Sequence, residues 1–454
     1  MNLGGLKKAI KTNLVLERVA RRLVALVPYS LRKLDKEFWF FYQLLQEMEK
    51  WPPDKVREYQ FNKLKSLVES AYLRSSFYRE KFNKAGFEPS QLCEWGDFSK
   101  VPFLTKDEVR QFSKEMVLSG IDFNSLSVGS TSGTTGKALP LYFDKNTLSR
   151  EWASICYQWK RVGYLPGDGR VELRGFIDRD VDYIYMPDER VLRVNIARMS
   201  ESNISLIVTK IVSLGYKFIH GYPSAVLKFA NILGGAKVHF KPQAIMMASE
   251  PLYDWQIEKI DEVFDCAKIV HYGMAEKVAL AAWDGDRKYH FIPAYGIVEH
   301  DSLNHEIIGT GLINQVMPLI RYRVTDSIDG FEALPEKMEK SLFPVVDKIH
   351  GREEDVTFDV FGNSIPPALV TFPFKSLRLI TGAKIIQIDK AQFIVIFESE
   401  FESTFEPLKT EISQVLGNLE KIYGSGSQYQ VELTKKIPVS SSGKFRWIEC
   451  RLHD

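Results

Sequence analysis

The most informative stretch of this sequence is Ser130-Thr131-Ser132-Gly133-Thr134-Thr135-Gly136-Lys137. Its glycines let backbone N–H groups turn toward a ligand, and successive exposed N–H groups form a concave site for an anion. The hydroxyl side chains add donors, and the lysine adds a point charge. The alternative is a flexible Ser/Thr/Gly surface loop. Because the stretch ends in Gly-Lys and runs directly into the apolar residues 138–143, it favours a loop that binds polyphosphate.

This loop is not a Walker A motif. A Walker A motif has a glycine five positions before its Gly-Lys pair and Ser or Thr after it, whereas this chain has Thr131 and Ala138 there. The P-loop ATPase and kinase folds are therefore disfavoured, and a different phosphate-binding site is expected.

The composition is that of an ordinary globular protein. At 454 residues, 45% of them hydrophobic and 26% charged, the chain is long enough for a large domain and a smaller one. A net charge of +2 gives no overall electrostatic case for nucleic acid or for an acidic partner. No apolar run approaches the ~20 residues of a membrane span. The histidines are scattered, and the cysteines are widely spaced, which favours a reducing cytoplasm over a disulfide framework or a zinc site: Cys93, Cys156, Cys266 and Cys450.

The N-terminal residues 6–26 are basic, with leucines among the charges. Glu17 is the one acidic residue among several Lys and Arg residues in this segment. Arg21-Arg22 interrupts the apolar run that a signal peptide requires. Two interpretations stay open. The segment is either a helix that lies on an anionic membrane surface, or a basic amphipathic helix packed on its own domain.

Helical spacing dominates the first 120 residues. Apolar residues recur at helical intervals over 38–48 and 56–72, with a stop at Trp51-Pro52-Pro53 between them. Thr105 and Glu108 have the spacing of a capping box. A further helix is expected over residues 152–161.

Strand–turn–helix units follow, and they predict an α/β fold with a mostly parallel sheet. Strands are expected over residues 217–220, 244–248 and 268–271, and helices over 204–214, 224–233 (capped by Ser224) and 251–264. Ligands gather beyond the carboxyl ends of such strands. Three candidate site segments fall there: 221–224, 249–251 and 272–276.

The chain is predicted to divide near residue 346. Residues 1–346 form the large domain, with antiparallel strands over 289–323, residues 347–352 a hinge, and residues 353–454 a small mobile α+β domain. In the small domain a hairpin is expected over 384–388 and 392–398, a helix over 405–416 and a strand over 429–433. A second Ser/Gly/Lys loop, residues 438–444, lies near its end.

Several polar residues each admit two interpretations. Glu276 is either a surface acid or a Mg²⁺ ligand beside a triphosphate, because a carboxylate oxygen suits a hard cation. Tyr272 is either a core residue or a stacking partner for adenine. Asp326 is either a turn residue or an acceptor for ribose hydroxyls. Arg352 and Lys444 are either solvated charges or contacts to the ribose and the phosphates.

In their order, these segments resemble the adenylate-forming superfamily, and more narrowly the branch of phenylacetate–coenzyme A ligases and CapK-type proteins of capsular polysaccharide loci. The similarity runs from about residue 30 to the end, and residues 71–79 and 101–106 look like the branch's N-terminal signature. The matching motifs are the phosphate loop Thr131–Lys137, the adenine loop Ala248-Ser249-Glu250-Pro251, the Tyr-Gly-x-x-Glu segment Tyr272–Glu276, the ribose motif Met317–Asp326, the hinge Asp347–Arg352 and the catalytic-lysine loop Pro438–Lys444.

The resemblance implies a two-step reaction with ATP and Mg²⁺, in which a carboxylate is adenylated and a nucleophile then displaces AMP. It implies that residues 131–137 hold the β- and γ-phosphates, that Glu276 holds Mg²⁺, and that Lys444 bridges the carboxylate and the α-phosphate. The small domain would rotate about Asp347-Lys348 between the steps. The nucleotide contacts it implies are Thr131, Ser132, Gly133, Thr134, Thr135, Gly136, Lys137, Ser249, Glu250, Pro251, Tyr272, Gly273, Asp326 and Arg352. The flanking residues Tyr222, Pro223, His271 and Met274 are expected to line the carboxylate pocket.

Two departures from the family pattern bear on the second step. The usual Arg-Thr-Gly-Asp of the ribose motif is here Arg323-Val324-Thr325-Asp326, and the glycine-rich segment after the hinge is only partly matched by residues 361–367. Because that segment shapes the thioester-forming face, CoA is a less secure expectation than adenylation. The preferred prediction is transfer to an acceptor in capsular or surface polysaccharide biosynthesis, with CoA, an amine and a hydroxyl group all open as that acceptor. The alternatives are a CoA ligase for an aromatic or other hydrophobic carboxylate, and a non-catalytic nucleotide-binding homologue. The expected setting is the cytoplasm, near the inner membrane surface, with no nucleic-acid partner.

Overall fold

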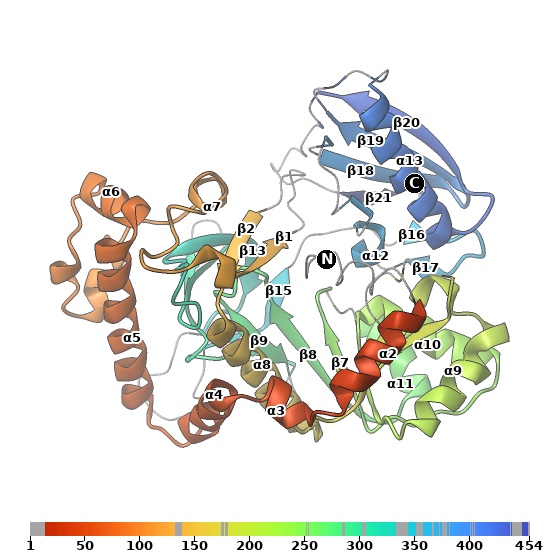
Figure 1. Ribbon diagram of the computed structural model, residues 1–454, viewed down its shortest axis with the longest axis horizontal. Coiled ribbons are helices and arrows are strands. Elements are labelled where there is room, and N and C mark those ends of the chain that lie inside the picture. Colours follow the sequence, from red (N-terminus) through yellow and green to blue (C-terminus); the bar gives the residue numbers. More distant parts are fainter. Residues whose placement is uncertain are drawn as a thin grey trace.

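The structure is a computed structural model that describes most of the chain. The described residues are 14–131, 139–173, 177, 180–250, 252, 254–283, 287–301, 306–332, 344–350, 357–365, 367–371, 373–374, 379–380, 382–399, 401, 403, 405–435, 437 and 447–452. Figure 1 shows a large body that holds the N-terminal and central elements, and a smaller body, drawn in blue, that holds the last strands and the last long helix.

Helices begin the described chain: α2 (Leu14–Ala25), α3 (Tyr29–Lys33), α4 (Lys36–Met48), α5 (Pro53–Arg74), α6 (Ser76–Lys84) and α7 (Lys106–Phe112). Local signals set their ends. Asp35 accepts a hydrogen bond from the Phe38 backbone N–H at the start of α4, over 2.9 Å. The predicted capping box of α7 is confirmed, because the Thr105 N–H donates to the Glu108 carboxylate over 2.8 Å and the Glu108 N–H donates to the Thr105 hydroxyl over 3.3 Å.

The large body is built on a nine-stranded sheet with the order β14-β10-β9-β8-β7-β6-β3-β5-β4. Its strands are β3 (Arg170–Leu173), β4 (Tyr183–Met186), β5 (Val191–Val194), β6 (Phe218–Gly221), β7 (Ala244–Ala248), β8 (Ala267–Gly273), β9 (Leu280–Trp283), β10 (Tyr289–Phe291) and β14 (Val345–Val346). The strands β8, β7, β6, β3 and β5 are parallel, and the outer ones pair antiparallel. The mostly parallel sheet expected from the sequence is therefore confirmed at the centre, and antiparallel strands extend it at both edges.

Helices cover this sheet: α8 (Lys145–Trp159), α9 (Glu201–Ser213), α10 (Pro223–Gly235) and α11 (Asp254–Val263). Helix α8 begins earlier than the expected residue 152, because Asp144 caps it by accepting from the Thr147 N–H over 2.8 Å. Side chains of α9, α10 and α11 pack on the apolar face of the central strands, and Ile219, Ile245 and Phe229 are fully buried there. This packing holds the central strands, and so their carboxyl ends, in place.

One local prediction for α10 is wrong. Ser224 does not cap the helix, since α10 starts at Pro223 and Tyr222 occupies the N-cap position without a side-chain hydrogen bond. Proline suits the first helical position because its missing N–H has no partner there in any case. The Ser224 hydroxyl donates instead to the Glu250 carboxylate, on the segment that follows the neighbouring strand.

Smaller sheets complete the large body. The hairpin of β1 (Ser127–Thr131) and β2 (Leu139–Phe143) pairs Thr131 with Leu139. A four-stranded antiparallel sheet has the order β11 (Gly296–Asp301), β12 (Glu306–Gly311), β13 (Tyr322–Asp329) and β15 (Lys348–His350). The antiparallel strands predicted for residues 289–323 are thereby confirmed.

The small body holds β16 (Thr357–Phe358), β17 (Ser364–Ile365), α12 (Pro367–Thr371), β18 (Gly382–Asp389), β19 (Gln392–Glu398), α13 (Glu406–Tyr423), β20 (Gln428–Thr434) and β21 (Ile448–Cys450). The predicted hairpin is β18–β19, and α13 continues past the expected end at residue 416. Its core includes the fully buried Ile385, Val395 and Leu419. The small body also contacts the large body through a charged pair, since Lys228 Nζ on α10 lies 3.8 Å from Asp359 Oδ2.

Candidate functional site

The three candidate segments lie at the carboxyl ends of three adjacent strands. Strands β6, β7 and β8 are neighbours in the sheet, and they end at Gly221, Ala248 and Gly273. The parallel registers place Gly221 beside Met247, and Ala248 beside His271. In parallel sheets this edge is where ligands bind. Segments far apart in the sequence therefore converge on one edge.

The segment after β7 is fixed by a turn and by its neighbour. Ser249 has a φ of +71°, a left-handed conformation that is uncommon for a residue with a side chain. Glu250, next to it, accepts from the Ser224 N–H over 3.3 Å and from the Ser224 hydroxyl. The predicted adenine loop is thus tied to the start of α10. Pro251, the last residue of that loop, lies outside the described residues.

At the end of β8, Tyr272 is paired with an acid from β13. The Tyr272 hydroxyl donates to Asp326 Oδ2 over 2.7 Å. Burial, and next the Asp326 carboxylate, raise the pKa of Tyr272 well above its ordinary value. The tyrosine therefore keeps its proton and remains a donor at neutral pH. The pair joins the predicted adenine and ribose positions directly.

Glu276 lies three residues beyond β8 and has a partner of the same kind. It is 8% exposed, and its Oε1 accepts from the Tyr322 hydroxyl over 3.1 Å. Burial, and next the Glu276 carboxylate, raise the pKa of Tyr322. Two phenol–carboxylate pairs thus link the end of β8 to β13. The Tyr272 environment also includes Glu276 and Tyr322, so the four groups form one electrostatic cluster.

The start of β13 is held in place by an arginine. Arg321, 6% exposed and with a φ of +50°, forms two hydrogen bonds to the Glu299 carboxylate, of 2.9 and 3.1 Å. Its guanidinium also lies 4.1 Å from the centre of the Phe103 ring. Leu104 pairs with the backbone on both sides of Tyr322, through 2.9 Å bonds to Arg321 and Arg323. Residues 101–106, noted in the sequence as a family signature, therefore buttress the ribose motif.

The predicted phosphate loop joins the two strands of the β1–β2 hairpin. Its first residue, Thr131, ends β1, while Ser132, Gly133, Thr134, Thr135, Gly136 and Lys137 lie outside the described residues. Beyond the loop, the Asn314 amide donates to the Tyr142 carbonyl over 3.1 Å, and the Tyr142 N–H contacts Met317 Sδ at 3.4 Å. These contacts hold β2 against the start of the ribose motif.

Two histidines lie close together near the residues that are predicted to line the carboxylate pocket. Tyr222 and Pro223 are buried at the start of α10. The His271 ring lies 5.9 Å from the His220 ring and 6.1 Å from the Trp159 ring, measured between centroids. His220 itself lies 4.7 Å from Trp159. Met274 and Gly273 follow on the other side, where a Cβ on Gly273 would come within 2.9 Å of Leu280.

The sequence pattern did not single out every residue of this edge. Tyr322, His220 and Trp159 were not chosen, although Tyr322 lies within the ribose motif. Regular alternation along a strand would place Tyr322 and Asp326 on the same side, but the register of β13 against β12 is irregular between Arg323 and Ser327. Glu276 is among the predicted site residues, but its contact with Tyr322 has no signal in the sequence, because the two lie on different elements.

The second step of the predicted chemistry depends on residues that are only partly described. Arg352 and Lys444 lie outside the described residues. The predicted hinge residues lie between two sheets, since Asp347 follows β14 and Lys348 begins β15. The Asp347 carboxylate lies 3.0 Å from Lys288 Nζ, and its N–H donates to the Asp329 carbonyl over 3.0 Å. Their role as a hinge stays a prediction.

The fit of a metal ion depends on one carboxylate. Among the described residues no group of three His, Cys, Asp or Glu side chains could hold a metal ion. Mg²⁺, however, is usually bound by one or two carboxylates together with the phosphates of a substrate. Glu276, a largely buried acid at the strand edge, meets that requirement.

Comparison with known proteins finds two kinds of similar chain. No protein-family model matches it. Protein CapK of Staphylococcus aureus is 22% identical over 398 residues, which cover 82% of this chain and 84% of CapK. A phenylacetate–coenzyme A ligase of Pseudomonas putida is 24% identical over 334 residues, 69% of this chain and 74% of the ligase. The predicted resemblance to CapK and to the phenylacetate–coenzyme A ligases of the adenylate-forming superfamily is confirmed.

Solved structures agree on the fold. A 2-hydroxyisobutyryl-CoA ligase, in complex with 2-HIB-AMP and CoA in the thioesterification state, matches with a TM-score of 0.58 and 17% identity, over 89% of this chain and 92% of that one. The predicted superfamily, its fold class and the class of adenylate-forming, AMP-producing ligases are confirmed. Within the described residues, no helix combines the length and the apolar character needed to cross a bilayer.

Proposed function

We propose that this protein activates a carboxylate with ATP and transfers the acyl group to an acceptor during the assembly of a surface polysaccharide. In the first step a carboxylate oxygen attacks the α-phosphorus of ATP, the new O–P bond forms, and the bond to the β-phosphate oxygen breaks to release pyrophosphate. In the second step a nucleophile attacks the acyl carbon, and the C–O bond to AMP breaks. The ligase class is given by the relatives, whereas the acceptor and the pathway are part of the proposal.

The observation that carries the proposal is the cluster formed by Tyr272, Asp326, Glu276 and Tyr322. It lies at the edge where β6, β7 and β8 end, and the β1–β2 hairpin leads into the Thr131–Lys137 loop. Carboxylates held in fixed positions by phenol donors are preorganised for a ribose and for a cation. In this assignment Asp326 accepts from the ribose hydroxyls, and the Tyr272 ring faces the adenine.

Charge is the main obstacle to the first step, because two anions must approach each other. Glu276 would hold Mg²⁺, which offsets the charge of the phosphates. The N–H groups and hydroxyls of residues 131–137 would bind the β- and γ-phosphates. Lys444 would bring its ammonium group to the attacking carboxylate and the α-phosphate, where negative charge accumulates.

The acceptor decides between two versions of this function. Similarity to CapK over most of both chains supports a sugar or amino-acid acceptor, in line with the altered segment 361–367. Similarity to phenylacetate–coenzyme A ligases supports CoA as the acceptor and an aromatic carboxylate as the substrate. The two polar rings of His220 and His271 favour a carboxylate with hydrogen-bonding groups over a purely apolar one.

Carboxylate-dependent exchange of pyrophosphate into ATP tests the first step. The panel should include sugar acids, amino acids and aryl acids, because their relative rates report on the pocket. Lys444→Ala is expected to lower exchange on the order of 10²-fold or more, since the contact forms only in the transition state. Lys435→Ala, an exposed lysine at the end of β20, is the matched control and should leave exchange unchanged.

The second step is tested by AMP release with the best carboxylate. CoA, amino acids and amino sugars are added in turn, and the product is identified by mass spectrometry. AMP release that depends on CoA alone would replace the polysaccharide proposal with the CoA-ligase alternative. Full exchange activity in Lys444→Ala would contradict the proposed mechanism of the first step.

A further inference from the structure

Helix α2 is attached to the large body by its polar side. Arg21 forms two hydrogen bonds to the Asp188 carboxylate, of 2.9 and 3.0 Å, and Glu17 pairs with Arg21 at 3.0 Å. Asp188 lies in the turn between β4 and β5, at the edge of the nine-stranded sheet. Two further bonds follow along the chain, from Arg32 to the Asp188 carbonyl over 2.9 Å and between Lys33 and Glu189 over 3.2 Å. Charged side chains thus fill the contact that a globular protein usually makes with apolar ones.

The apolar side of the same helix faces away from the protein. At 100° per residue, Leu16, Val19 and Leu23 fall on one stripe, roughly opposite to Arg21. All three are exposed, Leu23 by 61%. A surface helix normally turns its apolar stripe to the core and its charges to water. Helix α2 has the reverse orientation, so its apolar stripe is available to an outside partner.

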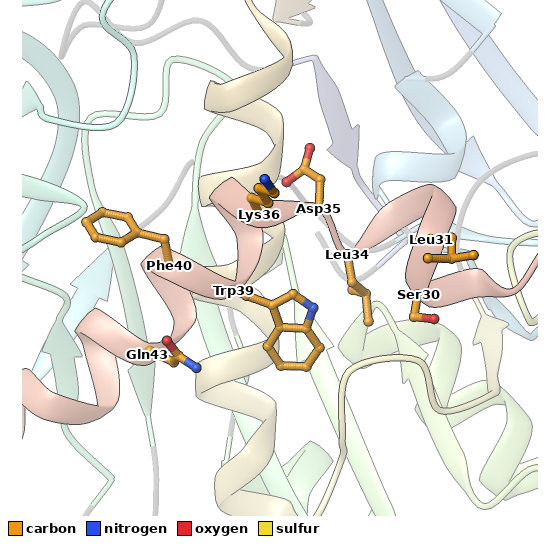
Figure 2. A pocket seen from close by; sticks show the side chains of 8 residues that line it. All are labelled: Ser30, Leu31, Leu34, Asp35, Lys36, Trp39, Phe40 and Gln43. Atoms are coloured by element: carbon orange, nitrogen blue, oxygen red, sulfur yellow. The ribbon is translucent and has the colours of Figure 1, made fainter.

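The exposed apolar surface continues beyond α2. Leu26, Val27 and Leu31 (76% exposed) follow in the chain, and Trp39 and Phe40 (63% exposed) lie on α4. Between α3 and α4, Leu31, Trp39 and Phe40 border a hollow of about 540 Å³. Figure 2 shows the Trp39 indole beside Leu34. The full lining is Ser30, Leu31, Leu34, Asp35, Lys36, Trp39, Phe40 and Gln43. In Figure 1 α4 and α3 lie at the lower edge of the molecule, and α2 continues from α3 across the view.

The charge of this region is strongly asymmetric. The whole chain has 60 Lys and Arg residues and 58 Asp and Glu residues. Residues 1–36 contain nine of the basic residues but only two of the acidic ones. The first 36 residues therefore have a formal charge of +7, and the other 418 a charge of −5, which the net value of +2 conceals. Arg22 and Lys36 are exposed on the described part of this region. Apolar side chains and cations thus occur together.

We propose that α2, α3 and the start of α4 dock this protein on a membrane surface that contains anionic lipids. Leucines, a tryptophan and a phenylalanine would enter the headgroup–acyl boundary, and the exposed cations Arg22 and Lys36 would lie at the level of the lipid phosphates. Each cation near such a surface adds an electrostatic attraction that salt weakens. The helices lie on the bilayer and do not cross it, in agreement with the absence of a spanning helix among the described residues.

Charge favours an anionic membrane over a second copy of the chain as the partner of this surface. An isologous dimer through the same surface would bring two segments of charge +7 together, and that repulsion disfavours the contact. An anionic bilayer is complementary both to the charges and to the exposed apolar side chains. The inference does not depend on the carboxylate or the acceptor, because none of these residues belongs to the strand edge described above.

Vesicle flotation with the full-length protein tests the proposal. The probes are vesicles of phosphatidylcholine alone and of phosphatidylcholine with phosphatidylglycerol, each at low and at high salt. Binding is expected to the anionic vesicles at low salt and to weaken at high salt, because the Debye length falls. Leu23→Ser/Leu31→Ser should reduce the partition coefficient at least tenfold, since both leucines would lose the apolar burial that favours the bound state.

The matched control is Leu73→Ser/Leu206→Ser, which removes two similarly exposed leucines from α5 and α9. It should bind like the unmodified protein, and both variants should keep full pyrophosphate-exchange activity. Equal binding by the two variants, or no binding of the unmodified protein to anionic vesicles at low salt, would overturn the proposal. A dimer in sedimentation velocity that only the Leu23→Ser/Leu31→Ser variant loses, without vesicle binding, would identify a second copy as the occupant instead.

Discussion

The hydroxyl of Tyr272 and the carboxylate of Asp326 are joined over 2.7 Å, although 54 residues separate them in the chain. The bond connects the end of β8, in the nine-stranded sheet, with β13, in the four-stranded antiparallel sheet. Two sheets therefore contribute to one edge. The geometry of the proposed nucleotide site depends on how firmly this pair holds them together.

Removing the hydroxyl should weaken ATP binding more than turnover. In Tyr272→Phe the Asp326 carboxylate loses a donor that fixes its orientation toward the ribose, at a cost of about 1–2 kcal/mol. The KM for ATP in the exchange assay should rise roughly five- to thirtyfold, with a small change in kcat. Tyr289→Phe, at another buried tyrosine on β10, is the control. A lower melting temperature with an unchanged KM would mean that the pair is only structural.

The Glu276–Tyr322 pair should control the metal requirement. Glu276→Gln removes the anionic oxygen proposed to hold Mg²⁺, so the Mg²⁺ concentration for half-maximal exchange should rise at least tenfold, on the order of 1.4 kcal/mol or more. Tyr322→Phe should give a smaller shift in the same direction, because the carboxylate stays but loses its orienting donor. Glu69→Gln, on the exposed side of α5, should leave the Mg²⁺ dependence unchanged. An unaltered Mg²⁺ profile in Glu276→Gln would remove Glu276 from the site.

The contact between Lys228 and Asp359 should stabilise the arrangement of the two bodies. Burial, opposed in part by Asp359, lowers the pKa of Lys228, so the pair is costly to break. Lys228→Met leaves Asp359 with its bonds from the Phe361 and Asn363 N–H groups but without its counter-charge. The expected loss is on the order of 3 kcal/mol in denaturant unfolding.

A double-mutant cycle separates this pair from the other bonds of Asp359. Asp359→Asn keeps an acceptor oxygen for the turn, and the double variant Lys228→Met/Asp359→Asn should be more stable than Lys228→Met alone. Simple additivity of the two single changes would show that Lys228 and Asp359 do not interact in solution.

Acid stability should depend on Glu172 in the central sheet. Burial alone would raise the pKa of Glu172, but Arg170 at 2.8 Å and Arg193 at 2.9 Å hold it below its ordinary value of 4.5. A carboxylate whose pKa is lower in the folded state stabilises the fold above the unfolded-state pKa. That stabilisation is lost as the pH falls through the folded-state value.

Glu172→Gln should therefore be less stable than the unmodified protein at pH 7, and the difference should shrink as the pH falls below about 4.5. Circular dichroism during unfolding at a series of pH values measures both effects. Glu258→Gln, an exposed acid on α11, is the control and should follow the unmodified protein throughout. A difference that is constant with pH would point to lost packing and not to the charge.

The sequence by itself determined the features that depend on near neighbours. The capping box of Thr105 and Glu108 can be predicted because both partners lie within one helical turn. The helices within residues 36–74 can be predicted because the spacing of apolar residues marks the buried side of a helix. The order of the motifs led to the superfamily, and the three site segments were correctly assigned to the ends of strands.

Only the tertiary structure decided which residues meet. The local sequence predicts that Ser224 caps a helix. Its hydroxyl instead donates to Glu250, because β6 and β7 are adjacent in the sheet. Glu276 and Tyr322 both lie in predicted motifs, but their contact depends on how the end of β8 and the start of β13 are placed in space. The amphipathic pattern of α2 predicted a helix with an apolar stripe, but not that its charged side would bind Asp188 and leave the leucines outside. Periodicity specifies the faces of an element, whereas the order and register of distant strands specify what each face touches.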